Sequence, residues 1–140
     1  MDVLVLIARI LFAFLFLASG FGHFASRKAM AGYAASKGVP YAEASVIGSG
    51  VLVLAGAVMV LLGLWGDLGA VFILIFVVST AVLMHPFWKE TDEQSKMMEM
   101  VQFNKDIALA GGAIAFLVLF SFAGPTLGLT LTDPVFSIGR

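Results

Sequence analysis

Long apolar runs alternate with short polar segments along this chain, and the pattern predicts four membrane-spanning helices. A helix rises about 1.5 Å per residue, so roughly 20 apolar residues cross a hydrocarbon core about 30 Å thick. Runs of about this length cover residues 3–24, 46–65, 68–84 and 103–122. We therefore expect an all-α integral membrane protein, a single domain over residues 1–140 that folds as a four-helix bundle with short interfacial helices.

The first run lacks the basic segment that opens a secretory signal peptide, since the chain starts with Met1 and Asp2. Arg9 also interrupts the apolar core of this run, so we expect an uncleaved first span. Residues 25–41 then turn polar and contain the helix-stopping sequence Gly-Val-Pro at 38–40. This segment forms either a short helix at the bilayer surface or a plain loop, and the sequence leaves both open.

Small residues are frequent in the second and fourth spans, where they let neighbouring helix backbones approach closely. Two pairs of small residues in the fourth span stand four positions apart: Ala108 with Gly112 and Gly111 with Ala115. This spacing predicts that the fourth span packs through a face of small side chains.

Turn signals set both ends of the third span. Residues 63–67 make a turn so short that the second and third spans must be antiparallel neighbours, and Asp67 can cap the third helix. Proline disfavours helix at the residue before it, so the third span ends at about His85. After the fourth span, residues 126–140 are apolar but broken by glycine and proline, so we expect this tail to lie along the surface.

Residues 85–106 form the main polar segment, and they carry eight of the seventeen charged side chains, which are 8 Lys and Arg and 9 Asp and Glu. Residues 85–88 predict a helix stop with an aromatic anchor at the membrane interface. Residues 93–101 have the amphipathic pattern of a surface helix, which suits a lipid surface or a docking partner equally. Lys105 and Asp106 predict a charged start of the fourth span.

Composition agrees with a membrane protein and excludes several functions. The chain is 61% hydrophobic and 12% charged, whereas soluble domains have about 25% charged residues. Its net charge of −1 provides no basic field for nucleic acid, so the lipid bilayer is the partner that composition implies. Because the chain has no cysteine, it offers no disulfide and no thiolate, and any redox role needs a bound cofactor or another subunit.

The distribution of Lys and Arg predicts how the chain is oriented in the membrane, because basic residues concentrate on the cytoplasmic side. Six of them lie in the first and third connections or at their borders: Arg27, Lys28, Lys37, Lys89, Lys96 and Lys105. Arg9 and Arg140 belong to the opposite side. We expect the first and third connections to be cytoplasmic and both termini to lie outside.

Arg9 and the two histidines are the candidate functional residues at the spans. A charge at the bilayer centre costs at least about 2.5 kcal/mol, so Arg9 should either face the bundle interior or snorkel to the surface. Arg9 and His23 share a helix face but lie ~21 Å apart along the axis, so they cannot form one site. His85 ends the third span on the same side of the membrane as His23.

A polar pocket can form at the mouth of the bundle if the ends of the first and third spans are adjacent. It would contain His23 and His85, and the nearby charged residues Arg27, Lys105 and Asp106 could join it. Such a pocket suits a quinone carbonyl or a small acid, and a histidine in it can relay a proton near neutral pH. In the alternative interpretation, the histidines only cap helix carbonyls and the charged pair only marks a helix start.

Neither a metal site nor a catalytic residue is predicted. The two histidines lack the spacing of metal ligands. Trp88 most simply anchors the end of the third span at the interface, and the alternative is a stacking platform for an aromatic ligand. The candidate ligand-binding residues are Arg9, His23, His85, Trp88, Lys105 and Asp106.

Several motifs together resemble the DoxX family of small four-helix membrane proteins. They are Arg9 with Ser-Gly-Phe-Gly-His at 19–23, Tyr33 with Gly-Val-Pro at 38–40, His-Pro-Phe-Trp at 85–88, and the segment 103–112. The similarity runs from about residue 7 to residue 120. Its most specific parts are residues 85–88 and Lys105 before the sequence Ala-Leu-Ala-Gly-Gly.

The resemblance implies a function in a membrane redox system, because relatives include a membrane subunit of thiosulfate:quinone oxidoreductase and a membrane partner in a bacterial oxidative-stress complex. We expect an accessory subunit of the bacterial inner membrane that is non-catalytic or interacts with a quinone. Its partner would be an oxidoreductase subunit or further copies of the chain. The family pattern has a glutamate where this chain has Val53 and an asparagine where it has Asp106, so Arg9 lacks its usual ion partner.

Two alternatives from other functional classes stay open. The first is a transport or export factor for a small hydrophobic compound, with a cleft between the glycine-rich second and fourth spans. The second is a membrane scaffold that docks a partner through residues 85–106.

Overall fold

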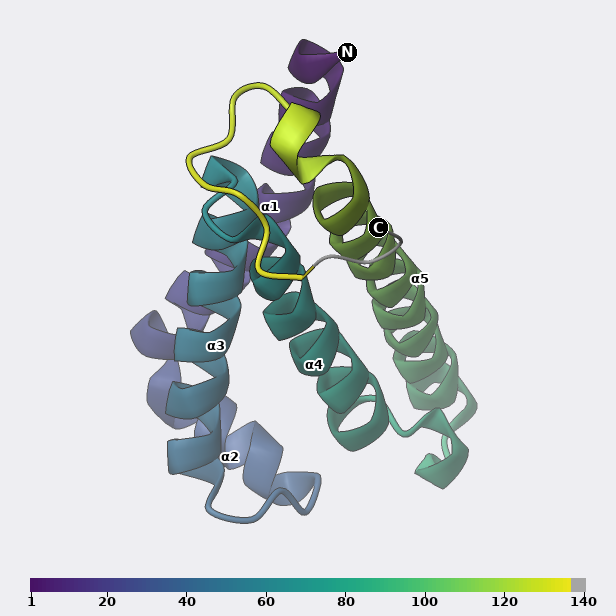
Figure 1. Cartoon of the computed structure of the whole chain (residues 1–140). Coiled ribbons are helices and arrows are strands. Elements are labelled where there is room, and N and C mark those ends of the chain that lie inside the picture. Colours follow the sequence, from purple (N-terminus) through teal and green to yellow (C-terminus); the bar gives the residue numbers. More distant parts are fainter. Residues whose placement is uncertain (137–140) are drawn as a thin grey trace.

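The computed structural model describes residues 1–136, which form five α-helices and two short 3₁₀ segments (Figure 1). The elements are α1 (Asp2–Ala25), α2 (Arg27–Ser36), α3 (Ala42–Leu62), α4 (Gly66–Met84), η1 (Phe87–Lys89), α5 (Glu93–Ala123) and η2 (Gly124–Thr126). The helices α1, α3, α4 and α5 are long and apolar enough to cross a membrane. The all-α membrane bundle predicted from the sequence is confirmed, and residues 27–36 are helix rather than loop.

Helices α3 and α4 form the centre of the bundle, with α1 packed on α3 and α5 packed on α4 (Figure 1). The N-terminus and the C-terminal end of α5 lie together, and we call this the termini end. The opposite end, which carries α2 and η1, is the loop end. The helices converge at the termini end and spread apart toward the loop end, where α2 packs on α3.

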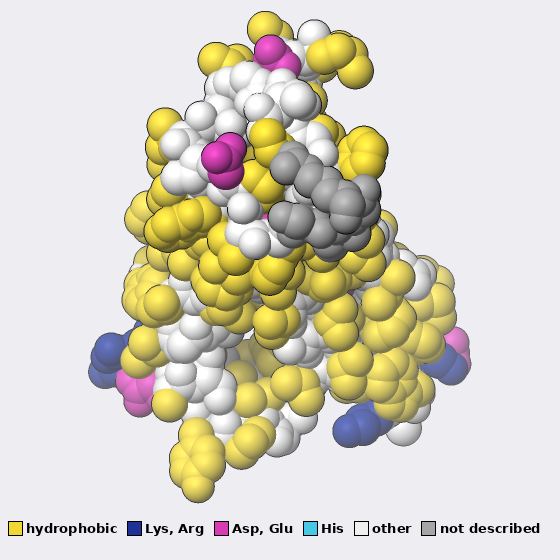
Figure 2. All heavy atoms as spheres, in the orientation of Figure 1, with side chains coloured by type: hydrophobic (Ala, Val, Ile, Leu, Met, Phe, Trp, Pro, Cys, Tyr) yellow, Lys and Arg dark blue, Asp and Glu magenta, His cyan; other side chains and the backbone are white. Residues whose placement is uncertain are grey.

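Apolar side chains from all four long helices meet in one core. Its largest fully buried members include Phe16 of α1, Val53 of α3 and Ile73 of α4. The ring of Phe12 lies 4.9 Å from that of Phe116, and this contact joins α1 to α5. The face of α1 that carries Arg9 and His23 points inward, and Phe12, Phe16 and Gly20 lie on it; all five residues are buried or half-buried. Apolar side chains also cover the flanks that would face lipid (Figure 2).

One continuous helix replaces the surface helix and the separate fourth span that the sequence predicted. Helix α5 has 31 residues, and Asp92 caps it by accepting a hydrogen bond from the Ser95 backbone N–H at 2.8 Å. No glycine or proline separates residues 93–101 from 103–122, so nothing ends the helix between them. Lys105 and Asp106 therefore lie roughly three turns inside α5 and do not start a helix.

The small-residue packing face predicted for the fourth span is wrong within the chain except at Gly112, which is half-buried and where a Cβ atom would lie 3.0 Å from the Phe12 ring. Ala108, Gly111 and Ala115 are exposed. The inward face of α5 carries Asp106, Ala110, Ala113, Phe116 and Phe120 instead. These residues have the three- and four-residue spacing of one helix face, and this face mixes small and large side chains.

The chain after α5 folds back across the termini end, as expected for a segment too short to span a membrane. The backbone N–H groups of Leu131 and Thr132 donate to the Gly63 carbonyl at 3.1 and 3.2 Å. Asp67 is not the cap of α4, since Trp65 occupies that position. The fully buried Asp67 carboxylate instead accepts a hydrogen bond from the Phe136 N–H at 2.5 Å. Arg140, which was counted in the predicted orientation, lies outside the described residues.

The close contact between α3 and α4 depends on two glycines that face each other. A Cβ atom at Gly56 would lie 2.9 Å from the Gly69 carbonyl oxygen and 3.0 Å from Phe72 Cβ. A Cβ atom at Gly69 would lie 2.6 Å from Met59 Cβ. Backbone atoms cannot move aside as the end of a side chain can, so glycine is required for this approach.

Replacing Gly56 by alanine should push α3 and α4 apart and lower the free energy of unfolding by about 1–3 kcal/mol. The matched control is Gly48→Ala, because a Cβ atom at Gly48 meets nothing within 4 Å. This control should be neutral or should stabilise the helix by up to about 1 kcal/mol. Unfolding in a denaturing detergent, followed by circular dichroism, measures both. Equal stability of the two variants would contradict the close α3–α4 contact.

Candidate functional site

Arg9 lies at the termini end and caps the C-terminus of α3. Its Nε donates to the Val60 carbonyl at 2.9 Å, its Nη2 to Leu61 at 2.5 Å and its Nη1 to Leu129 at 2.7 Å. The last carbonyls of a helix have no partner within the helix and carry its negative dipole end, so a buried cation suits them. Arg9, which is only 1% exposed, therefore acts within the fold and not at a ligand.

The absence of a glutamate at position 53 does not leave Arg9 without partners. Val53 is fully buried in the apolar core, and the carbonyls of α3 and of the tail receive the guanidinium hydrogens. Asp106 lies far from Arg9, in the wall of the loop-end cavity described below.

Substituting Arg9 by methionine should leave the Leu61 and Leu129 carbonyls without donors, remove one of the two donors of the Val60 carbonyl, and lower the free energy of unfolding by at least about 3 kcal/mol. It should also release the tail, because Leu129 loses the hydrogen bond that fastens it to α1. The first effect is read from detergent unfolding, and the second from faster chymotrypsin cleavage in residues 127–136.

The control for Arg9 is Arg27→Met. Arg27 forms an ion pair with Glu43 at 3.1 Å, and both side chains are exposed, 45% and 59% respectively. Such surface pairs contribute less than about 1 kcal/mol, so this variant should keep its stability and its protected tail. If both arginine variants behave alike, capping by Arg9 is not what holds the termini end together.

A cavity of about 590 Å³ lies among the spreading helices at the loop end, and we call it the loop-end cavity. The molecular surface is visibly hollowed there (Figure 2). Most of its lining is apolar, from residues such as Leu15, Phe16, Leu52 and Phe76. The polar or ionisable residues in the lining are Ser19, His23, Tyr33, Ser45, Ser49, Ser79, Thr80, His85, Lys105 and Asp106.

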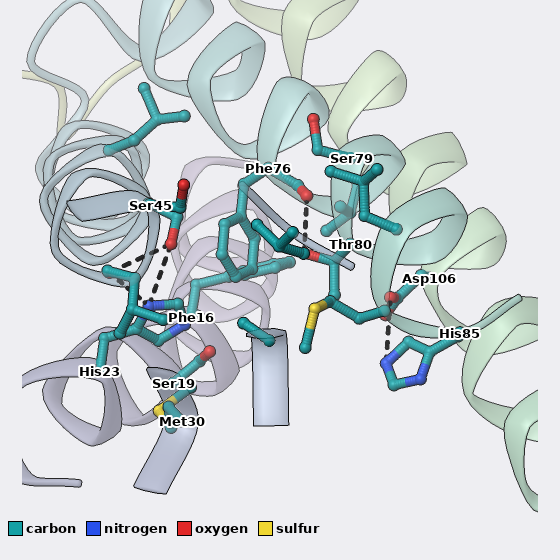
Figure 3. A pocket seen from close by; sticks show the side chains of 18 of the residues that line it. Phe16, Ser19, His23, Met30, Ser45, Phe76, Ser79, Thr80, His85 and Asp106 are labelled. Carbon is teal, nitrogen blue, oxygen red and sulfur yellow. Dashed lines mark hydrogen bonds and ion pairs between the residues drawn. The ribbon is translucent and has the colours of Figure 1, made fainter. Parts of the chain in front are cut away.

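His23 forms one polar point of the cavity wall (Figure 3). Its Nδ1 lies 2.9 Å from the Val46 carbonyl oxygen, which can only accept, so this nitrogen carries the hydrogen. In a neutral ring, Nε2 is then a free acceptor. Gly50 allows this placement, because a Cβ atom there would lie 2.8 Å from His23 Cβ.

His85 and Asp106 form a second polar point on the other side of the cavity (Figure 3). His85 Nδ1 lies 2.7 Å from Glu99 Oε2, and His85 Nε2 lies 3.9 Å from Asp106 Oδ2. Lys105 Nζ lies 3.6 Å from Asp106 Oδ1. Asp106 is only 4% exposed, and its Oδ2 atom has no hydrogen-bond partner within residues 1–136. A buried carboxylate oxygen left without a donor is costly, so this atom is ready to accept one from a ligand.

A polar cluster ties α2 to α5 beside the cavity, and we call it the Glu99 clasp: Tyr33, Lys37, Glu90 and Glu99. Lys37 Nζ lies 2.8 Å from Glu90 and 2.9 Å from Glu99, and the Tyr33 hydroxyl donates to Glu99 at 3.0 Å. The hydrogen bond with Glu90 raises the pKa of Lys37, while burial and the hydrogen bond to Glu99 raise that of Tyr33. Both groups therefore keep their protons at neutral pH and hold Glu99 as an anion.

Sequence reasoning did not single out Glu99 or Lys37 as site residues. They are 62 positions apart, and no local spacing links them. Their opposite charges were the available signal, but the chain has many charged residues near both connections.

The six candidate residues divide between different parts of the molecule. His23, His85, Lys105 and Asp106 line the loop-end cavity. Arg9 does not, and neither does Trp88, whose ring packs edge-on against Phe87 at 5.2 Å and Phe103 at 5.7 Å. Arg27, also considered for the pocket, pairs with Glu43 and is absent from the lining. Within residues 1–136, no three His, Asp or Glu side chains are grouped so that they could hold a metal ion.

Comparisons with known proteins agree with a membrane protein. The DoxX family model matches residues 4–86 of the chain. The chain is 32% identical over 123 residues to a protein of Escherichia coli (strain K12) named inner membrane protein YphA, and the alignment covers 88% of this chain and 84% of that protein. No solved structure gives a significant match.

Proposed function

Because the chain belongs to the DoxX family, we propose that it is a non-catalytic accessory subunit of a membrane redox system that binds a quinone in the loop-end cavity. The single observation that carries this proposal is a largely apolar cavity whose wall contains Asp106, a buried carboxylate whose Oδ2 atom has no hydrogen-bond partner within residues 1–136. The family alone does not assign a ligand, so the cavity and its polar groups supply the argument.

The chemistry of a quinone matches this distribution of polar groups. A quinone ring is apolar except for two carbonyl oxygens on opposite edges, and its reduced form has hydroxyl groups there instead. The cavity has His23 on one side and His85 with Asp106 on the other (Figure 3). Its volume of about 590 Å³ is within the usual range for small-molecule sites, roughly 300–1,000 Å³.

The groups lining the cavity explain why a partner is needed. Histidine, aspartate, serine and threonine can hold protons and hydrogen bonds, but they carry no electrons to a quinone. The chain has no cysteine to do so either. We therefore propose an oxidoreductase subunit as the partner, and assembly with further copies of the chain is the alternative.

The transport alternative placed its cleft between the glycine-rich second and fourth spans. Residues of both spans line the loop-end cavity, but none of the lining residues is a glycine, and the polar groups in the wall suit a quinone better than a purely hydrophobic compound. The scaffold alternative used the charges of residues 85–106. Two of these charges, Glu90 and Glu99, are engaged within the chain by Lys37.

Quinone binding is tested with the purified protein in lipid nanodiscs, titrated with the short-chain ubiquinone-1 by calorimetry. Ser19 lines the cavity, so Ser19→Trp should fill part of it and weaken binding at least about tenfold. The matched control is Ala18→Trp, since Ala18 is exposed on the same helix and does not line the cavity. A wild-type protein that takes up no quinone, or equal loss in both variants, would contradict the proposal.

We further propose that the protein lies in the bacterial inner membrane, as the name of its Escherichia coli relative states for that protein, with the loop end in the cytoplasm. Arg27, Lys37, Lys89 and Lys96 belong to the loop end, and this enrichment of basic residues supports the orientation. The N-terminus and η2 would then lie outside.

The orientation can be tested with single cysteines, because the natural chain has none. Thr91→Cys places a thiol at the loop end, and Asp133→Cys places one at the termini end; both positions are exposed. A membrane-impermeant maleimide should label Asp133→Cys in spheroplasts and Thr91→Cys only in inverted vesicles. The reverse pattern would show that the loop end faces outward.

A further inference from the structure

Three ionisable side chains form a line from the Glu99 clasp to the loop-end cavity. Glu99 Oε2 lies 2.7 Å from His85 Nδ1, and His85 Nε2 lies 3.9 Å from Asp106 Oδ2. The Glu99 and His85 side chains are 15% and 16% exposed, whereas that of Asp106 is 6% exposed. The line therefore runs from groups that reach water to a group that faces the cavity.

The two ends of the line differ in what they offer the imidazole between them. Lys37 and Tyr33 both donate to Glu99, which keeps this carboxylate an anion and an acceptor. The acceptor holds a hydrogen on His85 Nδ1. Protonation of the ring then changes only Nε2, the atom that faces Asp106.

Resting on quinone binding in this cavity, we propose that His85 and Asp106 share one exchangeable proton that makes the site select between the oxidised and the reduced form of its ligand. A quinone oxygen only accepts hydrogen bonds, so it needs the pair in its protonated form. A quinol hydroxyl donates, so it needs Asp106 Oδ2 free of the proton. The pair therefore takes up a proton when quinone binds and releases it when quinol binds.

The proton balance requires no further reactant. No bond within the ligand forms or breaks on binding, and the exchanged proton comes from water or returns to it past Glu99. Reduction or oxidation of the ligand stays the task of the partner subunit. The gap of 3.9 Å between His85 Nε2 and Asp106 Oδ2 is longer than a hydrogen bond, so Asp106 is not already occupied by the imidazole.

Other ionisable groups lie near His85 and Asp106, and their effects on binding must be distinguished from those of this pair. Lys105 lies beside Asp106 on α5, and Lys37 and Tyr33 of α2 act on Glu99. Lysine and tyrosine do not titrate between pH 5 and pH 8 in general. His23 of α1 is the other histidine in the cavity wall, so it needs its own control.

The test measures binding of ubiquinone-1 and ubiquinol-1 to the full chain in nanodiscs between pH 5.5 and 8.5, by calorimetry in buffers with different ionisation heats. For the wild type, quinone binding should weaken by up to about tenfold per pH unit above a midpoint, and quinol binding should strengthen by up to about tenfold per pH unit as the pH rises toward that midpoint, which corresponds to one proton. In His85→Gln/Asp106→Asn, both amides donate and accept, so both ligands should bind with little dependence on pH. His23→Gln should keep the opposite pH dependences.

A second variant keeps the proposal testable if the double variant fails to fold. Glu99→Gln removes the anion that favours protonated His85, so the quinone midpoint should move down by about one pH unit. An upward or absent shift would overturn the proposal. The proposal would also be overturned if the wild type bound both ligands without any dependence on pH. It would equally be overturned if the pH dependence of binding survived in the double variant or disappeared in His23→Gln. These results would leave quinone binding intact, whereas a wild type that binds neither ligand would refute the proposed function itself.

Discussion

Backbone carbonyls at the end of a membrane helix need donors, because lipid provides none, and Arg9 meets this need where α3 ends. The same guanidinium holds the tail through Leu129, so one side chain fastens α1, α3 and the segment that covers them. Asp67 adds a second link from α4 to the tail. The termini end is therefore closed by polar groups directed at backbone atoms.

The loop end is built in a different way. There the helices spread apart, and α2 fills only part of the space beside α3 (Figure 1). Polar side chains pair with each other across this end, from Lys37 on one side to Glu90 and Glu99 on the other. A bundle that is tightly packed at one end and held by side-chain pairs at the other can enclose a cavity of about 590 Å³ without losing its core.

Hydrophobic runs predicted the four spans well, because a bilayer imposes a length on every helix that crosses it. The turn at 63–67 and the stop at His85 were also predictable, since glycine and proline act locally. Contacts between distant segments were not. The carbonyl partners of Arg9 lie 51 to 120 positions away, and backbone groups leave no mark in the sequence. The glycine spacing in the fourth span was misleading because spacing alone does not say which face packs.

Because α5 is continuous, it holds the polar residues of the loop end at fixed positions relative to each other. Glu99 and Asp106 are seven positions apart, so in an unbroken helix they share a face, two turns apart. Pro86 ends α4 at a point where the His85 side chain lies between the Glu99 and Asp106 carboxylates. With separate surface and spanning helices, as the charge pattern suggested, these two carboxylates would have no fixed relation to each other. The uninterrupted helix therefore places one imidazole within 4 Å of two carboxylates, one in the Glu99 clasp and one in the cavity wall.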